Sequence, residues 1–440
     1  MERNLLSELT KWKERKNRKP LLLKGARQTG KTWSLKEFGR KEYKDVAYFN
    51  LDREPGIREI FEKNKNPIDI IRKLGYVIRK EIKEGETLLI LDEIQASRAA
   101  LNSLKYFKEE VPGYHVAAAG SLLGIYLSGL YTEDLKKGEE LTVPVGSVDM
   151  LNLHPMTFSE FLKADDEILY SYFKSISKGT QIETIFHERL LEEYGRYLIV
   201  GGMPECVSSW IENHDFDEVS RIQEDLLEIY ELDFAKYHGR ISSDKILLVF
   251  RRMVSQLAKP NEKFIYGALK KGARAKEYEG AIEWLSSAGL VNRIYNVSKP
   301  EIPLTAYENL DAFKLYLFDT GLLKHMAGLD NSPILTKSDY QFKGPLTENY
   351  VLQQLKPVQK VNPVYYSTKN GEIDFLVQYG NEIIPLEVKG GEDKSAPSFK
   401  RYIREHTPVH AIRLSKRNYM ENGDITNIPL YLAERINDLL

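Results

Sequence analysis

The N-terminal fold of this chain is decided by the stretch Pro20-Leu21-Leu22-Leu23-Lys24-Gly25-Ala26-Arg27-Gln28-Thr29-Gly30-Lys31-Thr32. Its last eight residues match the phosphate-binding pattern G-x-x-x-x-G-K-[ST] without departure. The apolar run before them predicts a buried parallel strand, and residues 33–38 predict a helix after them. This order points backbone N–H groups and a helix N-terminus at phosphate oxygens. A chance match in a surface turn is the alternative, and it leaves the flanking strand and helix unexplained.

These loop residues predict a site for ATP. Lys31 is expected to reach the β- and γ-phosphates, and Thr32 is expected to ligate Mg²⁺. The predicted nucleotide contacts are Gly25, Ala26, Arg27, Gln28, Thr29, Gly30, Lys31 and Thr32.

A second apolar segment, Thr87-Leu88-Leu89-Ile90-Leu91-Asp92-Glu93, predicts a strand that ends in two carboxylates. We expect Asp92 to hold Mg²⁺ and Glu93 to orient or deprotonate the attacking water. Strands often end in Asp-Glu for structural reasons alone, but here the pair follows the phosphate loop by about 60 residues, which favours a role at the nucleotide. Gln95 is a further candidate to face the nucleotide.

A third strand is predicted over residues 115–120, and Ser121 follows it. This arrangement resembles AAA+-like sheets, in which that strand lies between the other two and its end meets the γ-phosphate. Ser121 is therefore a candidate nucleotide contact. The alternative is that Ser121 caps a helix beginning at Leu122.

Composition narrows the class of protein. The 440 residues predict two to four domains, and 42% hydrophobic with 29% charged residues are typical of a globular protein. The net charge of −1 excludes a global basic field for nucleic acid. Cys206 is the single cysteine, so an intrachain disulfide is excluded. Neither a signal peptide nor an apolar stretch of ~20 residues is present, so we expect a cytoplasmic protein without a membrane partner.

We predict an α/β protein in four parts. Residues 1–160 form a P-loop domain with a parallel three-layer sheet, whose strands are expected at 21–24, 45–51, 87–92, 115–120 and 147–153. Residues 161–240 form a helical connector, 241–335 a winged-helix domain, and 336–440 a restriction-endonuclease-like α/β domain. The predicted wing covers residues 294–308. A winged helix can bind DNA or only pack against an ATPase core, and a basic helix at 270–276 is the best surface for DNA.

The C-terminal part carries the second candidate site. Residues 372–377 and 383–389 predict a hairpin around Tyr379-Gly380-Asn381, which places Asp374 and Glu387 on adjacent strands. Lys389 shares the sheet face of Glu387, and Glu348 enters from the preceding helix. Carboxylates at Asp374 and Glu387 suit a Mg²⁺ ion, and the lysine suits a phosphate, which is the chemistry of phosphodiester hydrolysis. Ordinary polar residues at strand ends are the alternative, because the pattern is short.

Taken together, these motifs resemble a large prokaryotic family of AAA+-like ATPases with a C-terminal domain of unknown function. The resemblance rests on GARQTGKT (25–32), ILDEIQ (90–95), AAGSLLG (118–124), VPVGSVDMLNLHPMTFSEFL (143–162), YLIVGGMPE (197–205), KKGARAKEYEGAIEWLSSAGLV (270–291), FKLYLFDTGLL (313–323) and GEIDFLV with IIPLEVKGG (371–391). It implies ATP and Mg²⁺ at the loop, Asp92 and Glu93. It also implies a nuclease-like fold with functional residues Glu348, Asp374, Glu387 and Lys389.

Two functions follow from the sequence. The first is an ATPase that acts on DNA through a Mg²⁺-dependent nuclease-like domain. The second is a nucleotide-dependent switch whose nuclease-like domain only docks protein or DNA. The resemblance also implies a homo-oligomer in which an arginine from a neighbouring subunit completes each ATPase site. Arg196 and Arg240 are weak candidates for that arginine.

Overall fold

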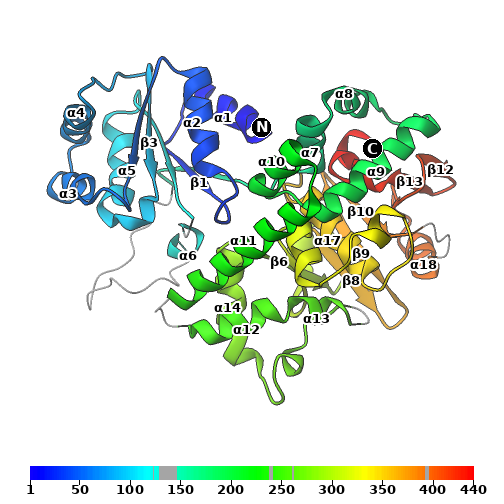
Figure 1. The fold of residues 1–440 in the computed structure, drawn as a ribbon. Coiled ribbons are helices and arrows are strands. Elements are labelled where there is room, and N and C mark those ends of the chain that lie inside the picture. The colour runs from blue at the N-terminus through cyan, green and yellow to red at the C-terminus, as the bar shows by residue number, and fades with distance from the viewer. Residues whose placement is uncertain (122, 128–145, 237–240, 260–261, 392–395) are drawn as a thin grey trace.

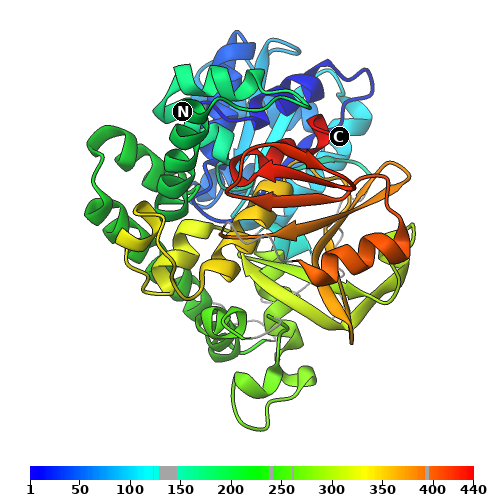
Figure 2. The same cartoon turned by 90° about the vertical axis from the view of Figure 1, so that its right-hand side faces the viewer.

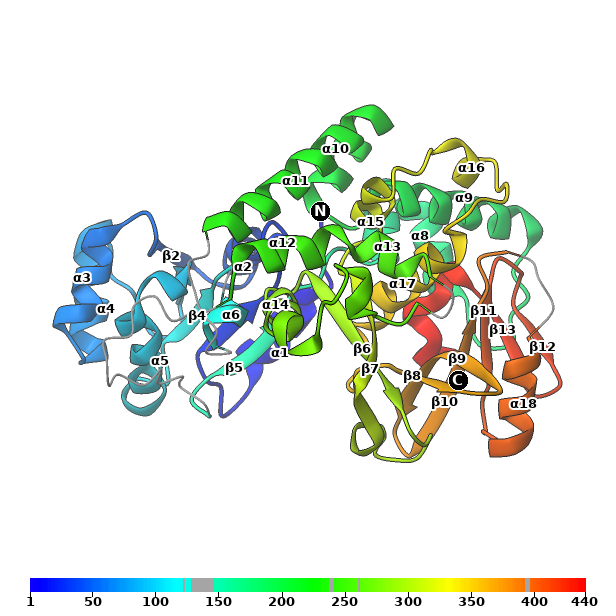
Figure 3. The same ribbon diagram turned by 90° about the horizontal axis from the view of Figure 1, so that it is seen from below.

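The computed structural model describes residues 1–121, 123–127, 146–236, 241–259, 262–391 and 396–440. A five-stranded sheet and an eight-stranded sheet lie at opposite ends of the molecule, and helices lie between them (Figures 1 and 3).

The five-stranded sheet has the order β2-β3-β4-β1-β5, and every neighbouring pair is parallel. Its strands are β1 Leu21–Lys24, β2 Asp45–Asn50, β3 Thr87–Asp92, β4 His115–Ala119 and β5 Asp149–Asn152. All five predicted strands are therefore present. β4 lies between β1 and β3, as the sequence predicts, so the ends of the three strands that carry the motifs are neighbours.

Helices cover both faces of this sheet because its strands are apolar on both sides. Leu88 and Ile90 of β3 pack with α1 and α2, whereas Leu89 and Leu91 of the same strand pack with α3, α4 and α5. The helices of this part are α1 Leu5–Glu14, α2 Lys31–Glu42, α3 Pro55–Lys63, α4 Pro67–Ile78, α5 Arg98–Glu110 and α6 Leu123–Leu127. The three-layer α/β arrangement confirms the predicted fold class for this part.

The middle of the chain is helical, as predicted. Its helices are α7 Phe158–Asp165, α8 Glu167–Ser175, α9 Thr184–Val200, α10 Pro204–Asn213, α11 Phe216–Lys236, α12 Ser243–Arg251, α13 Met253–Leu257 and α14 Ala275–Ser287. The predicted basic helix at 270–276 is wrong, because the helix begins only at Ala275. Gly272 has a φ of +83°, a left-handed conformation that interrupts a helix, so the basic residues before Ala275 lie in a turn.

The C-terminal sheet has the order β12-β13-β11-β10-β9-β8-β6-β7. Its strands are β6 Val291–Val297, β7 Glu308–Leu317, β8 Val364–Thr368, β9 Gly371–Tyr379, β10 Glu382–Val388, β11 Ile412–Ser415, β12 Met420–Asn422 and β13 Ile425–Pro429. Residues 294–308, which were predicted as a wing, lie within the hairpin of β6 and β7, but β6 also pairs in parallel with β8. The expected boundary at 335/336 therefore does not separate two sheets: a single sheet crosses it.

Helices α15 Thr320–Met326, α16 Ser332–Leu335, α17 Lys343–Leu355 and α18 Pro397–His406 complete the fold. Helix α17 packs on β7 and β10, and α18 packs over β9 through a separate cluster that includes Phe399 and Ile403 (Figure 2). One apolar core continues from the middle helices into the α17 side of the sheet. Among the described residues, no helix combines the length and the apolar character that crossing a bilayer requires.

Candidate functional site

The phosphate-binding loop joins β1 to α2 and turns sharply at two glycines. Gly25 has a φ of +154° and Gly30 a φ of +92°, and a Cβ at Gly25 would lie 2.3 Å from the carbonyl oxygen of Leu153. Only glycine fits at position 25. The Lys31 ammonium donates to the carbonyl oxygens of Gly25 at 3.0 Å and Ala26 at 2.7 Å, so it spans the loop. Burial lowers the pKa of Lys31 to about 8, although Glu93 and Asp92 oppose this shift.

The two predicted Mg²⁺ ligands lie side by side. The Thr32 hydroxyl donates to Asp92 Oδ2 at 2.8 Å, across 60 residues of chain. Tyr48, on β2, donates its hydroxyl to the same oxygen at 2.9 Å. Sequence reasoning missed Tyr48, because it reaches Asp92 only through the pairing of β2 with β3, in which Tyr48 lies opposite Ile90, two residues before Asp92. This oxygen donor set of a hydroxyl and a carboxylate suits Mg²⁺.

Glu93 lies next to Gln95 and Ser121, the two polar residues that were predicted to face the nucleotide. It has a left-handed φ of 48°, which turns its side chain away from the strand direction. Its Oε2 accepts hydrogen bonds from the Ser121 backbone N–H at 3.2 Å, the Ser121 hydroxyl at 3.1 Å and Gln95 Nε2 at 2.5 Å. Ser121 therefore contacts Glu93, the residue that was predicted to activate the attacking water. The alternative cap role involves Leu122, which lies outside the described residues.

The loop is also held by residues far from it in the sequence. Arg3 donates to the Thr29 carbonyl at 2.8 Å, and Tyr230 of α11 donates to the Arg27 carbonyl at 2.9 Å. The Arg27 side chain pairs with Asp233 of α11. No sequence motif marks Arg3, Tyr230 or Asp233, because their roles depend on how distant segments pack.

Beside the loop is a cavity of about 620 Å³, between the P-loop domain and the middle helices. Gly25, Ala26 and Ser121 line one side, while Glu283 and Ser286 of α14 line another. Gly289, just after α14, approaches the loop so closely that its Cβ would lie 3.3 Å from the Ala26 nitrogen. A ligand on this loop therefore contacts two parts of the chain.

The second candidate site lies at the end of the β9–β10 hairpin. The hairpin has the predicted pairing, with Phe375 opposite Leu386, so Asp374 and Glu387 lie on adjacent strands. Lys389 Nζ is 2.8 Å from Glu387 Oε1, and the backbone N–H of Val388 donates to Asp374 Oδ2 at 2.7 Å. Burial and the nearby Glu348 and Glu387 raise the pKa of Asp374, whereas Glu387 raises the pKa of Lys389 against the effect of burial.

Glu348 has other partners. It lies on α17, and its Oε2 accepts from the Tyr316 hydroxyl at 2.7 Å and lies 3.5 Å from Lys314 Nζ. The Lys314 ammonium is also 2.7 Å from Glu372 and 3.6 Å from Glu262, and its side chain is only 2% exposed. Lys314 was missed by sequence reasoning, because it lies after the predicted wing at 294–308 and meets its carboxylates only through tertiary packing.

Within the part of the chain that the structure describes, no group of three or more His, Cys, Asp or Glu residues is arranged to hold a metal. Of the two arginine candidates, Arg196 lies on α9 and donates to Glu193, and Arg240 lies outside the described residues.

Comparison with protein families assigns the N-terminal part. Residues 17–162, which contain the loop, Asp92, Glu93 and Ser121, match the family model of an AAA domain. This part is a P-loop ATPase domain. Residues 191–333 match a domain of unknown function (DUF8612), and residues 343–432 match another (DUF4143). The two further matches describe domains without giving them a role.

The individual relatives do not indicate a function for this chain. Uncharacterized proteins of Mycobacterium bovis and Mycobacterium tuberculosis are each 32% identical over 93 residues, which is 21% of this chain. The match spans only 20% of the length of these curated relatives.

Among solved structures, a Walker-type ATPase of Pyrococcus abyssi is similar at 15% identity, with a TM-score of 0.45, over 74% of this chain and 95% of that one. DnaA from Aquifex aeolicus is similar at 14% identity, with a TM-score of 0.26, over 64% and 85%. Likenesses of this size carry no functional assignment for this chain.

Proposed function

We propose that this protein is a Mg²⁺-dependent ATPase in which Glu93 is the general base. The hydrogen bond between Thr32 and Asp92 carries the proposal, because it joins the two oxygen ligands that a Mg²⁺ ion would share. In this scheme Lys31 leaves the Gly25 and Ala26 carbonyls to contact the β- and γ-phosphates. A bound Mg²⁺ would neutralise the developing phosphate charge.

Glu93 would take the proton of the attacking water, and Ser121 would fix the position of its carboxylate. A Glu93→Gln variant should keep ATP affinity and lose turnover by ~100-fold or more, since the amide is not a base. Lys31→Ala should lose binding itself. Glu109→Gln, on the same domain and exposed, is the matched control. Undiminished turnover in Glu93→Gln, measured by phosphate release, would remove this residue from the mechanism.

For the C-terminal part we infer an action on nucleic acid. The ion pair of Lys389 with Glu387, beside Asp374 on the next strand, supports this inference. Asp374 and Glu387 would share a Mg²⁺ ion, and Lys389 would approach the scissile phosphate. Glu348 would complete the acidic side of this centre.

A second function is favoured by Lys314. Its buried ammonium lies 2.7 Å from Glu372, 3.5 Å from Glu348 and 3.6 Å from Glu262, so a lysine already supplies positive charge among these acidic residues. In this version ATP hydrolysis drives a switch, and the C-terminal domain docks nucleic acid or protein without cleaving it.

One assay distinguishes the nuclease from the switch. Cleavage of single-stranded, duplex and branched DNA would be measured with Mg²⁺, with and without ATP, for the wild type, Asp374→Asn and Lys31→Ala. Cleavage that disappears in Asp374→Asn supports the nuclease, and its loss in Lys31→Ala makes it ATP-gated. ATP turnover without cleavage of any substrate supports the switch.

A further inference from the structure

A groove of about 840 Å³ lies on the side of the C-terminal sheet that α18 covers. One wall is α18 and the other is the β12–β13 hairpin, and Figure 3 shows the helix beside these strands. The charged side chains that line the groove are Lys400, Arg401, Arg404, Arg413, Arg417 and Asp424. Five cations and one carboxylate thus gather in a chain whose net charge is −1. Such a local excess of positive charge attracts a polyanion.

Helix α18 presents its cations to the groove as a row. Phe399 is buried in the cluster under the helix, whereas Lys400 and Arg404 are exposed. These two residues are one helical turn apart, which separates their Cβ atoms by ~5–6 Å. The helix is held in place because Arg401 Nη1 donates to a backbone carbonyl of the β8–β9 turn at 2.8 Å. The row of charge is therefore part of a fixed wall.

Arg413 connects the groove with the second candidate site. It lies on β11, directly opposite Glu387 of β10 in their parallel register. The flanking residues Leu386, Val388 and Leu414 are buried in the core on the α17 side of the sheet. Because side chains alternate along a strand, Glu387 and Arg413 share the opposite face, which α18 covers.

The Arg413 side chain has an unpartnered hydrogen-bond donor. The residue is only 9% exposed, and its Nε has no hydrogen-bond partner among the described residues. Burial raises the pKa of Glu387, and Lys389 and Arg413 oppose this shift, so Arg413 adds positive charge near the candidate centre. A guanidinium beside a cavity is stabilised when an anion enters it, and its planar set of N–H donors matches the oxygen atoms of a phosphate.

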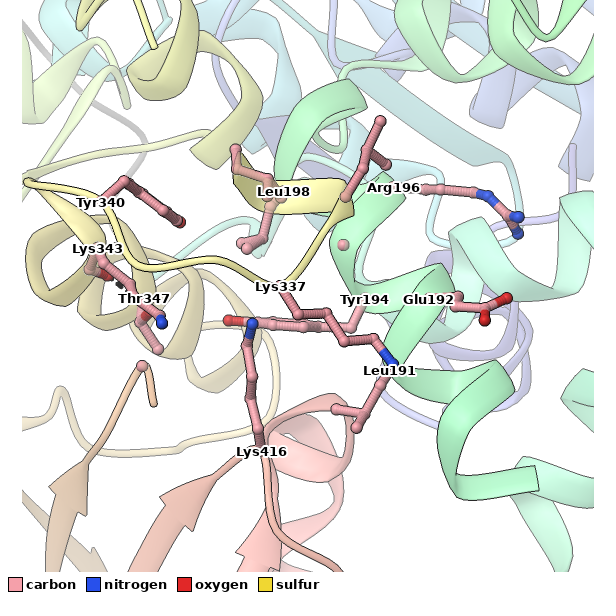
Figure 4. A pocket seen from close by; sticks show the side chains of 14 residues that line it. Leu191, Glu192, Tyr194, Arg196, Leu198, Lys337, Tyr340, Lys343, Thr347 and Lys416 are labelled. Atoms are coloured by element: carbon pink, nitrogen blue, oxygen red, sulfur yellow. Dashed lines mark hydrogen bonds between the residues drawn. The ribbon is translucent and has the colours of Figure 1, made fainter. Parts of the chain in front are cut away.

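A smaller cavity of about 220 Å³, beside α9 and α17, is also lined by basic side chains (Figure 4). Three of its cations pair with carboxylates of the protein: Lys337 with Glu188, Lys343 with Asp339 and Arg196 with Glu193. In the groove, Lys400 and Arg404 pair with no carboxylate of the described residues. An anion that enters the groove therefore has no carboxylate to displace from these two side chains.

We propose that this groove binds the sugar–phosphate backbone of a nucleic acid, with Lys400 and Arg404 on its phosphates and Arg413 on the phosphate nearest Glu387. The proposal rests on the nucleic-acid role proposed above and adds the surface along which the strand lies. The volume is within the roughly 300–1,000 Å³ of pockets that enclose drug-sized ligands, so more than one phosphate fits. Lysine and arginine contacts with phosphates position a nucleic acid without reading its bases, so we expect binding that is independent of base sequence.

The test is binding of a fluorescein-labelled single-stranded oligonucleotide and of its duplex, followed by fluorescence anisotropy at several salt concentrations. Lys400→Gln/Arg404→Gln changes two exposed residues and should weaken binding ~10-fold or more and lower the salt slope by about two. The matched control is Lys270→Gln/Lys271→Gln, which removes two exposed cations from the basic turn before α14 and should change affinity little. ATP turnover should be the same in both variants.

Arg413→Gln tests the connection to the second candidate site. We expect it to weaken oligonucleotide binding ~5-fold or more, and Arg413→Lys to recover part of the loss because it keeps the charge. Thermal unfolding is measured for both variants, and the exposed pair Lys400 and Arg404 decides the case if Arg413→Gln does not fold. Unchanged affinity in a folded Arg413→Gln would overturn the placement of a phosphate beside Glu387.

The outcomes separate the groove from the nucleic-acid role. Wild-type binding that is unchanged in Lys400→Gln/Arg404→Gln, or equally weakened in Lys270→Gln/Lys271→Gln, would overturn the groove and leave the nucleic-acid role intact. A wild type that binds no oligonucleotide would overturn the nucleic-acid role. Poly-glutamate is the remaining probe: its binding through Lys400 and Arg404, without oligonucleotide binding, would assign the groove to an acidic protein and overturn the proposal.

Discussion

Arg27 and Asp233 connect the phosphate-binding loop to a helix 206 residues away in the sequence. Arg27 Nη1 lies 2.6 Å and 2.7 Å from the two carboxylate oxygens of Asp233 on α11. The pair places a negative charge beside the loop that is to receive phosphates, and it occupies the one arginine of that loop. The loop and α11 are therefore joined by this ion pair and by the hydrogen bond from Tyr230 to the Arg27 carbonyl.

Asp233→Asn should tighten ATP binding by ~2–5-fold, since it removes a carboxylate near the phosphates and frees Arg27 to reach them. Its effect on stability should be below ~1 kcal/mol, because the Arg27 side chain is 47% exposed. Titration with ATP by calorimetry measures the first effect and thermal unfolding the second. Asp225→Asn, an exposed residue on the same helix, is the control. Weaker ATP binding in Asp233→Asn would mean that the ion pair holds the loop in its binding form.

Tyr48→Phe should raise the Mg²⁺ concentration needed for half-maximal ATP turnover by ~10-fold. The Tyr48 hydroxyl donates to Asp92 Oδ2, and loss of such a partner leaves a metal-binding carboxylate less well oriented. Turnover at saturating Mg²⁺ should stay close to that of the wild type. An unchanged Mg²⁺ dependence, in a variant that is folded, would show that Thr32 alone positions Asp92.

Lys314→Met should destabilise the protein by ~3–5 kcal/mol. It removes a buried cation and leaves Glu348 and Glu372 without their positive partner. Burial and Glu348 raise the pKa of Glu262 to about 10, so Glu262 already holds a proton at neutral pH. The double variant Lys314→Met/Glu348→Gln should recover part of this loss, since it removes one of the buried carboxylates that Lys314 pairs with. Urea unfolding followed by circular dichroism measures both. A double variant no more stable than the single one would mean that the unpaired Glu348 carboxylate is not the cause of the loss.

Glu434 predicts a dependence of stability on pH. Burial raises the pKa of Glu434 to about 7, although the hydroxyls of Ser159 and Thr157 oppose the shift. Between pH 4.5 and 7 the folded chain therefore holds a proton at Glu434 that the unfolded chain has lost, and stability falls as the pH rises through this window. Glu434→Gln should be more stable than the wild type by up to ~3 kcal/mol at pH 8.

At pH 4.5 the same substitution should change stability little. Urea unfolding at the two pH values measures the difference. Glu405→Gln, exposed on α18, is the control. Equal effects of Glu434→Gln at both pH values would show that the substitution acts through packing and not through the proton.

The N-terminal site was largely predictable from sequence because its signals are local. The loop, the strand that ends in Asp92 and the strand before Ser121 each lie within one short segment, and parallel pairing then brings their ends together. The β9–β10 hairpin was predictable for the same reason: Gly380 has the positive φ of 59° that the turn requires, and alternation set the register.

The remaining features of the fold and of the two sites depend on contacts between segments that are distant in the sequence. The anchors Arg3 and Tyr230 reach the loop through tertiary packing, and Lys314 meets its carboxylates only because β7 lies in the C-terminal sheet. The pairing of β6 with β8 could not be read from the sequence either, since a hairpin looks the same whether it forms a wing or an edge of a larger sheet.

That shared sheet has a consequence for how such chains change over evolutionary time. The two families of unknown function meet between residues 333 and 343, yet β6 and β7 precede this junction while the other six strands follow it. Exchange of either segment for a foreign one would break the parallel pairing of β6 with β8 at Asn296 and Tyr365 and would expose both strand edges. The two segments should therefore be inherited together, as one unit behind an ATPase domain whose own sheet is complete without them.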